Sequence, residues 1–482
     1  DSKLWPKDFF HALVKSDLRS RVAAVKKEIS AWDDNDTCDL IDIAQKTPGA
    51  SIVPLGELYT RKKDLSYKFR QYMMGQMLKR GKDFRDTFST TVSWDGVRWF
   101  LSLACACAMR IYGHDAITGY LQAPEKFDIY AFCPSHEEYS RLTYEELALL
   151  RKELLDLLEK EGPEGLKKFA DVHKKESRVN PKKCLRINRS IYGNPGAGHA
   201  FEMLMQGAHI HTCGMEQTEV EQSIYVKFLV DENDRVVEYL FATGWTDDFR
   251  HFGTEGLRKQ YCKDLTSRVK VTYLGECNEF VGVEIHNNIE RGTLELKNPK
   301  YWLKAGKKFE EHFPNKFRAR KSPMSLADER IMCEEIMDKD HEQVSHLPYK
   351  ELLGTVSYPA SCVKPELRYA VSVCGRHRSK WGVRQWNVLR RVFEYGYETR
   401  NIGLMYSRGL DIHGVNVLYS YADSGHSVPR SQGCDTTMMN GAAISFDSKR
   451  HTITGTSTCH DELLSFSKSV SKTLGFRNLM QE

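Results

Sequence analysis

The spacing of hydrophobic and polar residues changes several times along the chain, and each change predicts a different element. Residues 236–245 are mostly apolar, β-branched or aromatic without a helical period, which predicts a β-strand. Asp247 and Asp248 interrupt this run, and the aromatic-rich residues 249–252 follow at once. This pattern predicts a β-hairpin with two carboxylates at its tip.

The segments on either side of this hairpin also have clear periods. Residues 95–109 form an apolar run that predicts a buried helix, and residues 110–121 predict a strand. Closer to the start, the pattern predicts a basic helix over residues 17–32 and strands over 51–60 and 66–75. Near the end it predicts strands over 417–427, 436–448 and 452–456, then a helix over 457–470 capped by Thr458 with Asp461.

Two stretches are predicted to lie outside this pattern of core elements. Residues 142–163 have leucines at helical spacing and a Gly162-Pro163 stop, and a lysine-rich stretch follows them. Residues 135–182 are therefore predicted to form a charged helical insertion, either a solvated helical hairpin or a surface that binds a protein partner or contacts RNA. The acidic and polar residues 325–345 predict a linker.

Composition narrows the class of protein. The chain has 482 residues, 41% of them hydrophobic, which is enough for about two to four domains with buried cores. A net charge of +5 permits a polyanionic partner without requiring one. The 13 cysteines form no CxxC pair, so we expect reduced thiols of an intracellular protein, in the cytoplasm or nucleus, without a zinc site. We expect no membrane association, because no apolar run is long enough to span a bilayer.

The adjacent Asp247 and Asp248 carry the most informative chemistry. Neighbouring carboxylates repel each other, so a fold that fixes both at a hairpin tip usually neutralises them with a cation, and Mg²⁺ prefers such oxygens. Asp115 stands alone in an uncharged stretch. A buried carboxylate is costly unless it is paired or bound to a metal, which makes Asp115 a third candidate ligand. A solvated Asp-Asp turn is the alternative.

Several motifs follow one another in a fixed order. They are HDAITGYL at 114–121, KKCLRINRSIYG at 182–193, WTDD at 245–248, EFVGVEI at 279–285, YKELLGTVSYPASCVKPELRYAV at 349–371, SYADS at 420–424 and ISFDSKR at 444–450. On these motifs the chain resembles the pol region of copia-type LTR retrotransposons, in which a reverse transcriptase precedes an RNase H. The sequence from Trp245 to Asp248 is similar to the Tyr-X-Asp-Asp hairpin of that family.

The resemblance implies an α+β fold: a right-hand polymerase with fingers, palm and thumb, a helical connection and a partial RNase H-like α/β domain. Residues 297–321 gather basic residues around aromatic ones, and we expect a thumb helix there that follows a template-primer duplex. The expected domains are the fingers and first part of the palm (1–134), the helical charged insertion (135–182), the palm with the Asp-Asp hairpin (183–290), the thumb and linker (291–340), the helical connection (341–410) and the partial RNase H-like domain (411–482).

The resemblance also implies an RNA-directed DNA polymerase that uses an RNA template, a DNA primer and deoxynucleoside triphosphates. The catalytic, metal-binding residues would be Asp115, Asp247 and Asp248, which hold two Mg²⁺ ions, or Mn²⁺, while the primer 3′-hydroxyl attacks the nucleotide. The nucleotide-binding positions of the family correspond to Lys68 and Arg70, which would meet the triphosphate, and to Tyr120, a steric gate under the sugar. Without the resemblance, these would be two solvated strand charges and a core tyrosine.

The chain departs from the family pattern in two places. After Ser-Ile-Tyr-Gly the family usually continues Leu-Lys-Gln, and that Gln contacts the nucleotide, whereas this chain has Asn194-Pro195-Gly196. Either backbone groups of this turn take over, or nucleotide binding is weakened. In the RNase H-like part, the metal-binding carboxylates map to Asp423 and Glu462, and the chain ends before the strand that carries the next ligand. We therefore expect little or no RNase H activity. Because the first residue is Asp, we also expect a processed product or a fragment.

Three functions are compatible with these observations. The first is an active reverse transcriptase, which the three palm carboxylates favour. The second is a domesticated, catalytically weak relative that serves as a nucleic-acid-binding or structural subunit of a larger assembly, which the missing Gln, the insertion and the shortened RNase H favour. The third is a nuclease or another two-metal phosphotransferase. Whether Asp115 and Asp247 converge in the fold is the observation that bears most directly on the choice.

Overall fold

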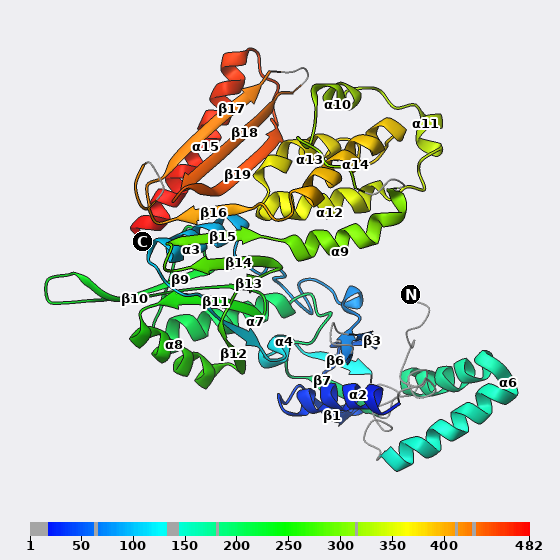
Figure 1. The fold of residues 1–482 in the computed structure, drawn as a ribbon. Helices are drawn as coiled ribbons and strands as arrows, with labels where there is room; N and C mark the ends of the chain where they lie inside the picture. The colour runs from blue at the N-terminus through cyan, green and yellow to red at the C-terminus, as the bar shows by residue number, and fades with distance from the viewer. Residues whose placement is uncertain are drawn as a thin grey trace. The chain divides into compact units, whose positions relative to one another are not determined.

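The computed structural model describes residues 18–61, 66–132, 144–179, 183–313, 317–409, 413–426 and 430–482 (Figure 1). The chain divides into two compact units. Both units combine helices with largely antiparallel sheets, which confirms the mixed α and β content expected from the sequence. Unit 1 comprises residues 1–90, 116–212 and 264–271, and unit 2 comprises residues 91–115, 213–263 and 272–482.

Unit 1 contains a four-stranded sheet in the order β1-β7-β6-β2 and a separate antiparallel hairpin, β3-β4. Its core buries Trp32, Met73 and Leu121, which come from a helix, the hairpin and a short helix. The predicted N-terminal helix and strand pair are thus confirmed. The elements are α2 (Leu18–Asp33), β1 (Cys38–Asp42), β2 (Ser51–Val53), β3 (Leu55–Arg61), β4 (Tyr67–Met73), α4 (Gly119–Gln122), β6 (Ile129–Phe132), β7 (Lys183–Ile187) and α7 (Ala197–Gly207).

The predicted insertion contains α6 (Tyr144–Val179), which has two helical halves. Gly162 separates them with φ 66° and ψ −163°, a conformation that glycine adopts without the steric penalty of a side chain. Pro163 then begins the second half, where its missing N–H is tolerated. The predicted Gly-Pro stop is therefore a turn between two helical segments.

The central sheet of unit 2 has the order β12-β5-β11-β10-β9-β8. The buried helix predicted over 95–109 is confirmed as α3, whose N-cap Ser93 accepts a hydrogen bond from the Gly96 N–H at 2.9 Å. The elements are α3 (Trp94–Ala106), β5 (Tyr112–Ala116), β8 (Glu216–Gln217), β9 (Ile224–Val230), β10 (Val236–Trp245), β11 (Asp248–Gly253), α8 (Glu255–Arg268) and β12 (Val271–Glu276).

The strand predicted over residues 110–121 is shorter than expected. β5 ends at Ala116, and Thr118 then adopts a left-handed conformation with φ 52°. The following residues 119–122 form the short helix α4. Tyr120 therefore lies on a helix rather than on the strand that carries Asp115.

The remainder of unit 2 contains a helical group and two further sheets, which have the orders β13-β14-β15-β16 and β17-β18-β19. The elements are β13 (Glu279–Phe280), β14 (Val283–Asn288), β15 (Thr293–Lys297), α9 (Pro299–Phe309), α10 (Leu326–Ile331), α11 (Asp338–Glu342), α12 (Tyr349–Cys362), α13 (Arg368–Gly375), α14 (Val383–Glu398), β16 (Leu404–Ser407), β17 (Tyr419–Gly425), β18 (Gln432–Met439), β19 (Ala442–Arg450) and α15 (Thr458–Gln481).

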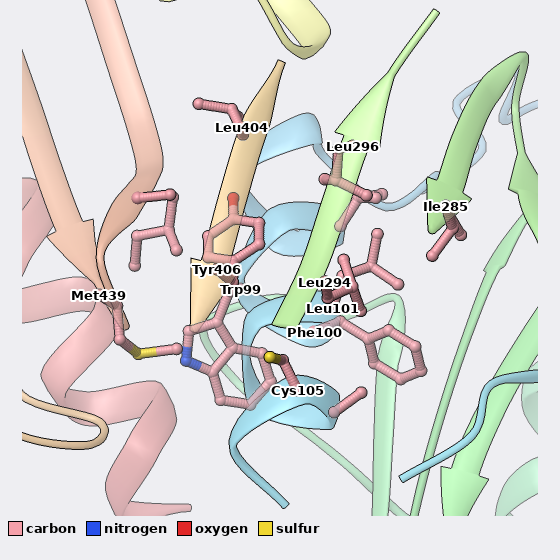
Figure 2. Close-up of a cluster of buried hydrophobic side chains, with 14 of the residues drawn as sticks. Trp99, Phe100, Leu101, Cys105, Ile285, Leu294, Leu296, Leu404, Tyr406 and Met439 are labelled. Carbon is pink, nitrogen blue, oxygen red and sulfur yellow. The ribbon is translucent and has the colours of Figure 1, made fainter. Parts of the chain in front are cut away.

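One hydrophobic core runs through unit 2 from the central sheet to the C-terminal sheet. Figure 2 shows Trp99 and Cys105 of α3 among Leu296 of β15, Tyr406 of β16 and Met439 of β18. All five side chains are buried. Helix α3 and the C-terminal sheet are therefore stabilised by the same apolar contacts.

The buried Arg98 joins these parts by hydrogen bonds. Its side chain is 1% exposed and forms an ion pair with Asp95 on the same helix. Its guanidinium also donates to the carbonyl oxygens of Ser361 (2.7 Å) and Cys362 (2.9 Å) on α12 and of Ile444 (2.8 Å) on β19. A buried cation with this many partners fixes α3 against both elements.

The helix predicted within residues 297–321 is present as α9, whereas the predicted linker differs from the structure. In α9, Trp302 and Phe309 point into a second core, and the exposed positions are the lysines and Leu303. Residues 325–345 contain α10 and α11, and Met332 and Val344 are buried in the same core. This stretch is therefore packed structure and not a linker, although Leu326 and Met337 are exposed.

The C-terminal segment also differs in detail. The single strand predicted over 436–448 is a hairpin, β18-β19, which turns at Asn440 and Gly441 with positive φ. No strand forms over the described residues 452–456. The helix cap is Ser457 rather than Thr458, since the Ser457 side chain accepts from the His460 N–H at 3.2 Å.

Two observations within the described ranges concern the cysteines and the apolar helices. The cysteines there are free thiols. None of the helices described combines the length and apolar character needed to cross a bilayer.

Candidate functional site

The hairpin predicted around Asp247 and Asp248 is present. Trp245 of β10 pairs with Asp248 of β11, so Thr246 and Asp247 form a two-residue turn. Thr246 has a φ of 55°, which is rare for a β-branched residue and marks a turn that its surroundings hold in place. Gly244 is required beside it, because an added Cβ would lie 2.4 Å from the Phe249 ring.

The structure brings Asp115 to this hairpin. Asp115 of β5 is the direct partner of Asp248 in the antiparallel β5-β11 pair. Directly opposite residues project their side chains from the same face of a sheet, about 5 Å apart. Burial raises the pKa of Asp248, and the negative charge of Asp115 adds to this rise. The two carboxylates therefore interact, although they lie far apart in the sequence.

Arg250 is a further charged residue at this site, and the sequence analysis did not identify it. Its guanidinium pairs with both carboxylate oxygens of Asp248, and the Nη2–Oδ2 distance is 3.1 Å. It also donates to the Glu279 carbonyl at 2.7 Å and lies 4.9 Å from the centre of the Phe280 ring. The signal was available, since an arginine between the aromatic residues of FRHF is unusual for a buried strand.

The arrangement meets the requirements for a divalent cation only in part. Within the described ranges, no group of three or more His, Cys, Asp or Glu side chains is arranged to hold a metal. The expected centre of three aspartates is thus not preformed, because Asp248 is engaged by Arg250. Mg²⁺ commonly takes one or two carboxylates and completes its shell with water and phosphate oxygens. Asp115 and Asp247 fit that chemistry.

The opposite face of the same strands is aromatic and apolar. His114 stacks on His251 at 5.1 Å and packs near Tyr261 and Tyr273 at 5.9 and 5.2 Å. Burial, helped by the charge of Arg250, lowers the pKa of His114 to about 4. His114 is therefore neutral at pH 7 and supports the strand that carries Asp115 through packing.

In unit 1, the structure brings two of the three expected nucleotide-binding residues to one ring. The Arg70 guanidinium lies 3.8 Å from the centre of the Tyr192 ring, and the Tyr120 ring lies 5.3 Å from it. Lys68 precedes Arg70 on the same face of β4, and both positive charges oppose the rise that burial causes in the pKa of Glu28. Three segments distant in sequence thus meet at Tyr192.

The turn that replaces the expected Gln lies nearby in the same unit. The Asn194 side chain donates to Glu125 at 2.6 Å and accepts from the Gly196 N–H at 2.9 Å. The Gly196 backbone donor is therefore already used inside the turn. Together these residues line a cavity of about 410 Å³ that also includes His199. Substitution of the missing amide by this backbone group is not supported by this geometry.

The RNase H-like candidates are both exposed. Asp423 lies on β17 and Glu462 on α15, and both charges act on the Cys434 thiol, whose pKa is raised mainly by burial. The sequence analysis did not identify Asp435 and Asp447 as buried acids and placed Asp461 only in a helix cap, and each of the three is buried and has partners. Asp435 pairs with Lys472 (2.5 Å) and Lys468 (2.9 Å), Asp447 with Arg368 and Lys449 (2.9 Å), and Asp461 with His426 (2.6 Å) and Ser431 (2.5 Å).

No family model matches the chain. It is 21% identical over 494 residues to the retrovirus-related Pol polyprotein from transposon TNT 1-94 of Nicotiana tabacum, covering 99% of this chain and 33% of that protein. A truncated transposon Ty1-A Gag-Pol polyprotein of Saccharomyces cerevisiae is 22% identical over 394 residues, 76% of this chain and 31% of that protein. The homologues of this chain are Ty1/copia-type retrotransposon Pol polyproteins.

This finding confirms the resemblance drawn from the motifs. The chain spans about a third of the length of the tobacco and Ty1-A polyproteins. A putative transposon Ty5-1 protein of Saccharomyces cerevisiae is 26% identical over 190 residues, 39% of this chain and 58% of that protein. Among solved structures, the foamy viral protease-reverse transcriptase in complex with dsDNA aligns with 94% of this chain and 72% of that chain, at a TM-score of 0.40 and 10% identity.

Proposed function

We propose that this chain is an RNA-directed DNA polymerase of copia-type retrotransposon origin. The observation that carries the proposal is the direct pairing of Asp115 with Asp248, next to Asp247 in the hairpin turn. Homology to retrotransposon Pol polyproteins supports the same reading. The right-hand division into fingers, palm and thumb and the use of an RNA template and a DNA primer belong to this proposal.

The proposed roles follow from the chemistry of each side chain. Asp115 and Asp247 would hold Mg²⁺ or Mn²⁺. The bound ions would activate the primer 3′-hydroxyl and neutralise the leaving pyrophosphate. Arg70, with a planar fork of donors, suits the oxygens of a nucleoside triphosphate, and Lys68 would add a point charge. Tyr120 would exclude a ribose 2′-hydroxyl by its bulk.

A second candidate function is a catalytically weak subunit that binds nucleic acid or supports a larger assembly. Two observations favour it. Arg250 engages Asp248, and the turn at Asn194 uses its own backbone donor. The helices of α6 would offer the partner surface in that case, since Leu149 and Leu155 are 66% and 38% exposed.

We propose further that the chain has little or no RNase H activity. Asp423 and Glu462 are exposed, and the described residues near them include no third acid placed to complete a metal site. The buried acids of this sheet are engaged by lysine, arginine, histidine or serine, so they would serve its stability.

Primer extension on an RNA template separates these functions. The full chain is given a DNA primer, deoxynucleotides and Mg²⁺ or Mn²⁺, with Asp247→Asn as the inactive variant and Asp423→Asn as the matched control. Extension that Asp247→Asn abolishes and Asp423→Asn preserves supports the polymerase. Tight binding of the RNA-DNA duplex without extension supports the scaffold, and template cleavage without incorporation supports a nuclease.

A further inference from the structure

We propose that Arg250 is the counter-cation of Asp248, so that divalent-ion binding at the hairpin depends on Asp115 and Asp247 and not on Asp248. The metal-binding half of this inference rests on the proposed polymerase function. Arg250 would be a positioning residue that acts through Asp248. It would also set how much negative charge the hairpin offers to a metal.

The ion pair between Arg250 and Asp248 follows from the geometry of strand β11. Residues two apart on a strand project from the same face, so Arg250 and Asp248 of β11 are neighbours on the face that also carries Asp115. The guanidinium contacts both carboxylate oxygens of Asp248. Its Nη1 and Nη2 also donate to the carbonyl oxygens of Phe249 at 2.8 Å and Glu279 at 2.7 Å, which fix its orientation.

The neighbouring residues leave a space that suits this guanidinium. Gly113, opposite Arg250 on β5, has no side chain, and an added Cβ would lie 2.8 Å from Nη1 and 3.2 Å from Cζ. Phe280 of β13 covers the cation from another side at 4.9 Å. As a result the Arg250 side chain is only 5% exposed. A pair held by these contacts resists replacement of the arginine by a metal, because separating buried charges is strongly unfavourable.

The formal charges lead to the same conclusion. Asp115, Asp247, Asp248 and Arg250 together sum to two negative charges, which one divalent ion balances. A second ion would bring excess positive charge unless a triphosphate accompanied it. We therefore expect one divalent ion at the hairpin before nucleotide binds.

Direct measurement of Mn²⁺ binding tests the proposal without relying on activity. Electron paramagnetic resonance of the full chain, titrated with Mn²⁺ alone, gives the Kd for the wild type and for Asp115→Asn, Asp247→Asn and Asp248→Asn. We expect the Kd to rise about tenfold or more for the first two variants and by less than about threefold for Asp248→Asn. An equal rise for Asp248→Asn and Asp247→Asn would overturn the proposal.

Removing the arginine provides a second, opposite readout. Arg250→Leu should release Asp248 and lower the Kd for Mn²⁺ about fivefold or more, and this gain should vanish in the double variant with Asp248→Asn. Arg258→Leu is the matched control, because Arg258 stacks on Tyr112 at 4.0 Å on the other face. Should Arg250→Leu fail to fold, Arg250→Gln also removes the positive charge but keeps a polar side chain, and a lower Kd is still expected.

The outcome also separates this inference from the polymerase proposal. If the wild type binds no Mn²⁺ and extends no primer while Arg250→Leu binds Mn²⁺, the counter-cation role holds and the polymerase proposal fails. If folded Arg250 variants bind Mn²⁺ no better than the wild type, the counter-cation role is rejected, whatever the extension assay shows.

Discussion

Two regions of unit 2, the Asp-Asp hairpin and the C-terminal sheet, each contain several carboxylates. These carboxylates differ in their burial and in their ion-pair partners. In the C-terminal sheet, Asp435 and Asp447 are almost fully buried, and each has two or more basic partners. In the hairpin region, three aspartates lie together in partly accessible positions, and Arg250 pairs with Asp248. Burial with matching cations is typical of structural acids. Accessible acids that share a small area are typical of a site for an external cation.

The family pattern assigned candidate metal ligands to both regions, but the structure arranges the two sets of ligands differently. Asp423 and Glu462 match the motif but lie exposed on separate elements. Asp115 and Asp248 match it and are direct partners across two strands. Sequence position identified both sets, and only the second set is supported by geometry.

The largest expected effect concerns catalysis. Asp115→Asn should lower primer extension by about a thousandfold, because it removes a charge that the proposed metal site needs. Asp423→Asn, an identical change on the C-terminal sheet, should leave the rate within about twofold. Extension rates on one RNA template give both values. An equal loss of extension rate in the two variants would contradict the proposed difference between the regions.

The next effect tests whether the two regions fold as one. Arg98→Met should reduce the free energy of unfolding by about 4 kcal/mol, because it removes the ion pair of a buried arginine and leaves three carbonyl oxygens without their donor. Urea denaturation measures it, with Arg477→Met on the exposed side of α15 as the control, expected within about 0.5 kcal/mol. A wild-type transition that already separates into two would contradict a shared core.

The third effect is a pH dependence of the hairpin region. The folded pKa of His114 lies at about 4, below its ordinary 6.5, so the unfolded chain binds this proton first as the pH falls. Stability from this group is complete above about 6.5 and decreases toward pH 4, by up to about 3 kcal/mol. Arg250, His251, Tyr261 and Tyr273 surround the ring.

Unfolding free energies measured between pH 4 and 7 test this effect. His114→Phe keeps an aromatic ring but binds no proton, so its stability should change less across this range than that of the wild type. An unchanged slope in His114→Phe would assign the pH dependence to another group.

The smallest effect concerns the C-terminal sheet in more acidic solution. Burial raises the pKa of Asp447, but hydrogen bonds from Lys449 and Arg368 outweigh it, so the folded pKa lies well below the ordinary value of 3.8. This contribution is present above pH 3.8 and is lost as the pH falls below it. Asp447→Asn should cost about 2 kcal/mol at pH 7 and less at pH 2, measured by thermal unfolding. A constant cost at both pH values would indicate a packing defect instead.

The sequence was sufficient for local features. β-Branched and aromatic content predicted the hairpin over residues 236–252, and an apolar run predicted α3, because these elements depend on contacts between near neighbours. It was less reliable at ends and linkers. The left-handed backbone conformation of Thr118 ends β5 earlier than predicted. Residues 325–345 have the composition of a linker, but Met332 and Val344 are buried in a core.

What the sequence by itself determined was which residues are chemically suited to a site: a pair of aspartates in a turn, a lone upstream aspartate and a family order that the homologues confirm. Only the tertiary structure decided which of them meet. The register of β5 against β11 places Asp115 opposite Asp248 and Gly113 opposite Arg250. Strand pairing between distant segments is set by the packing of the whole unit, and a local pattern does not contain that information.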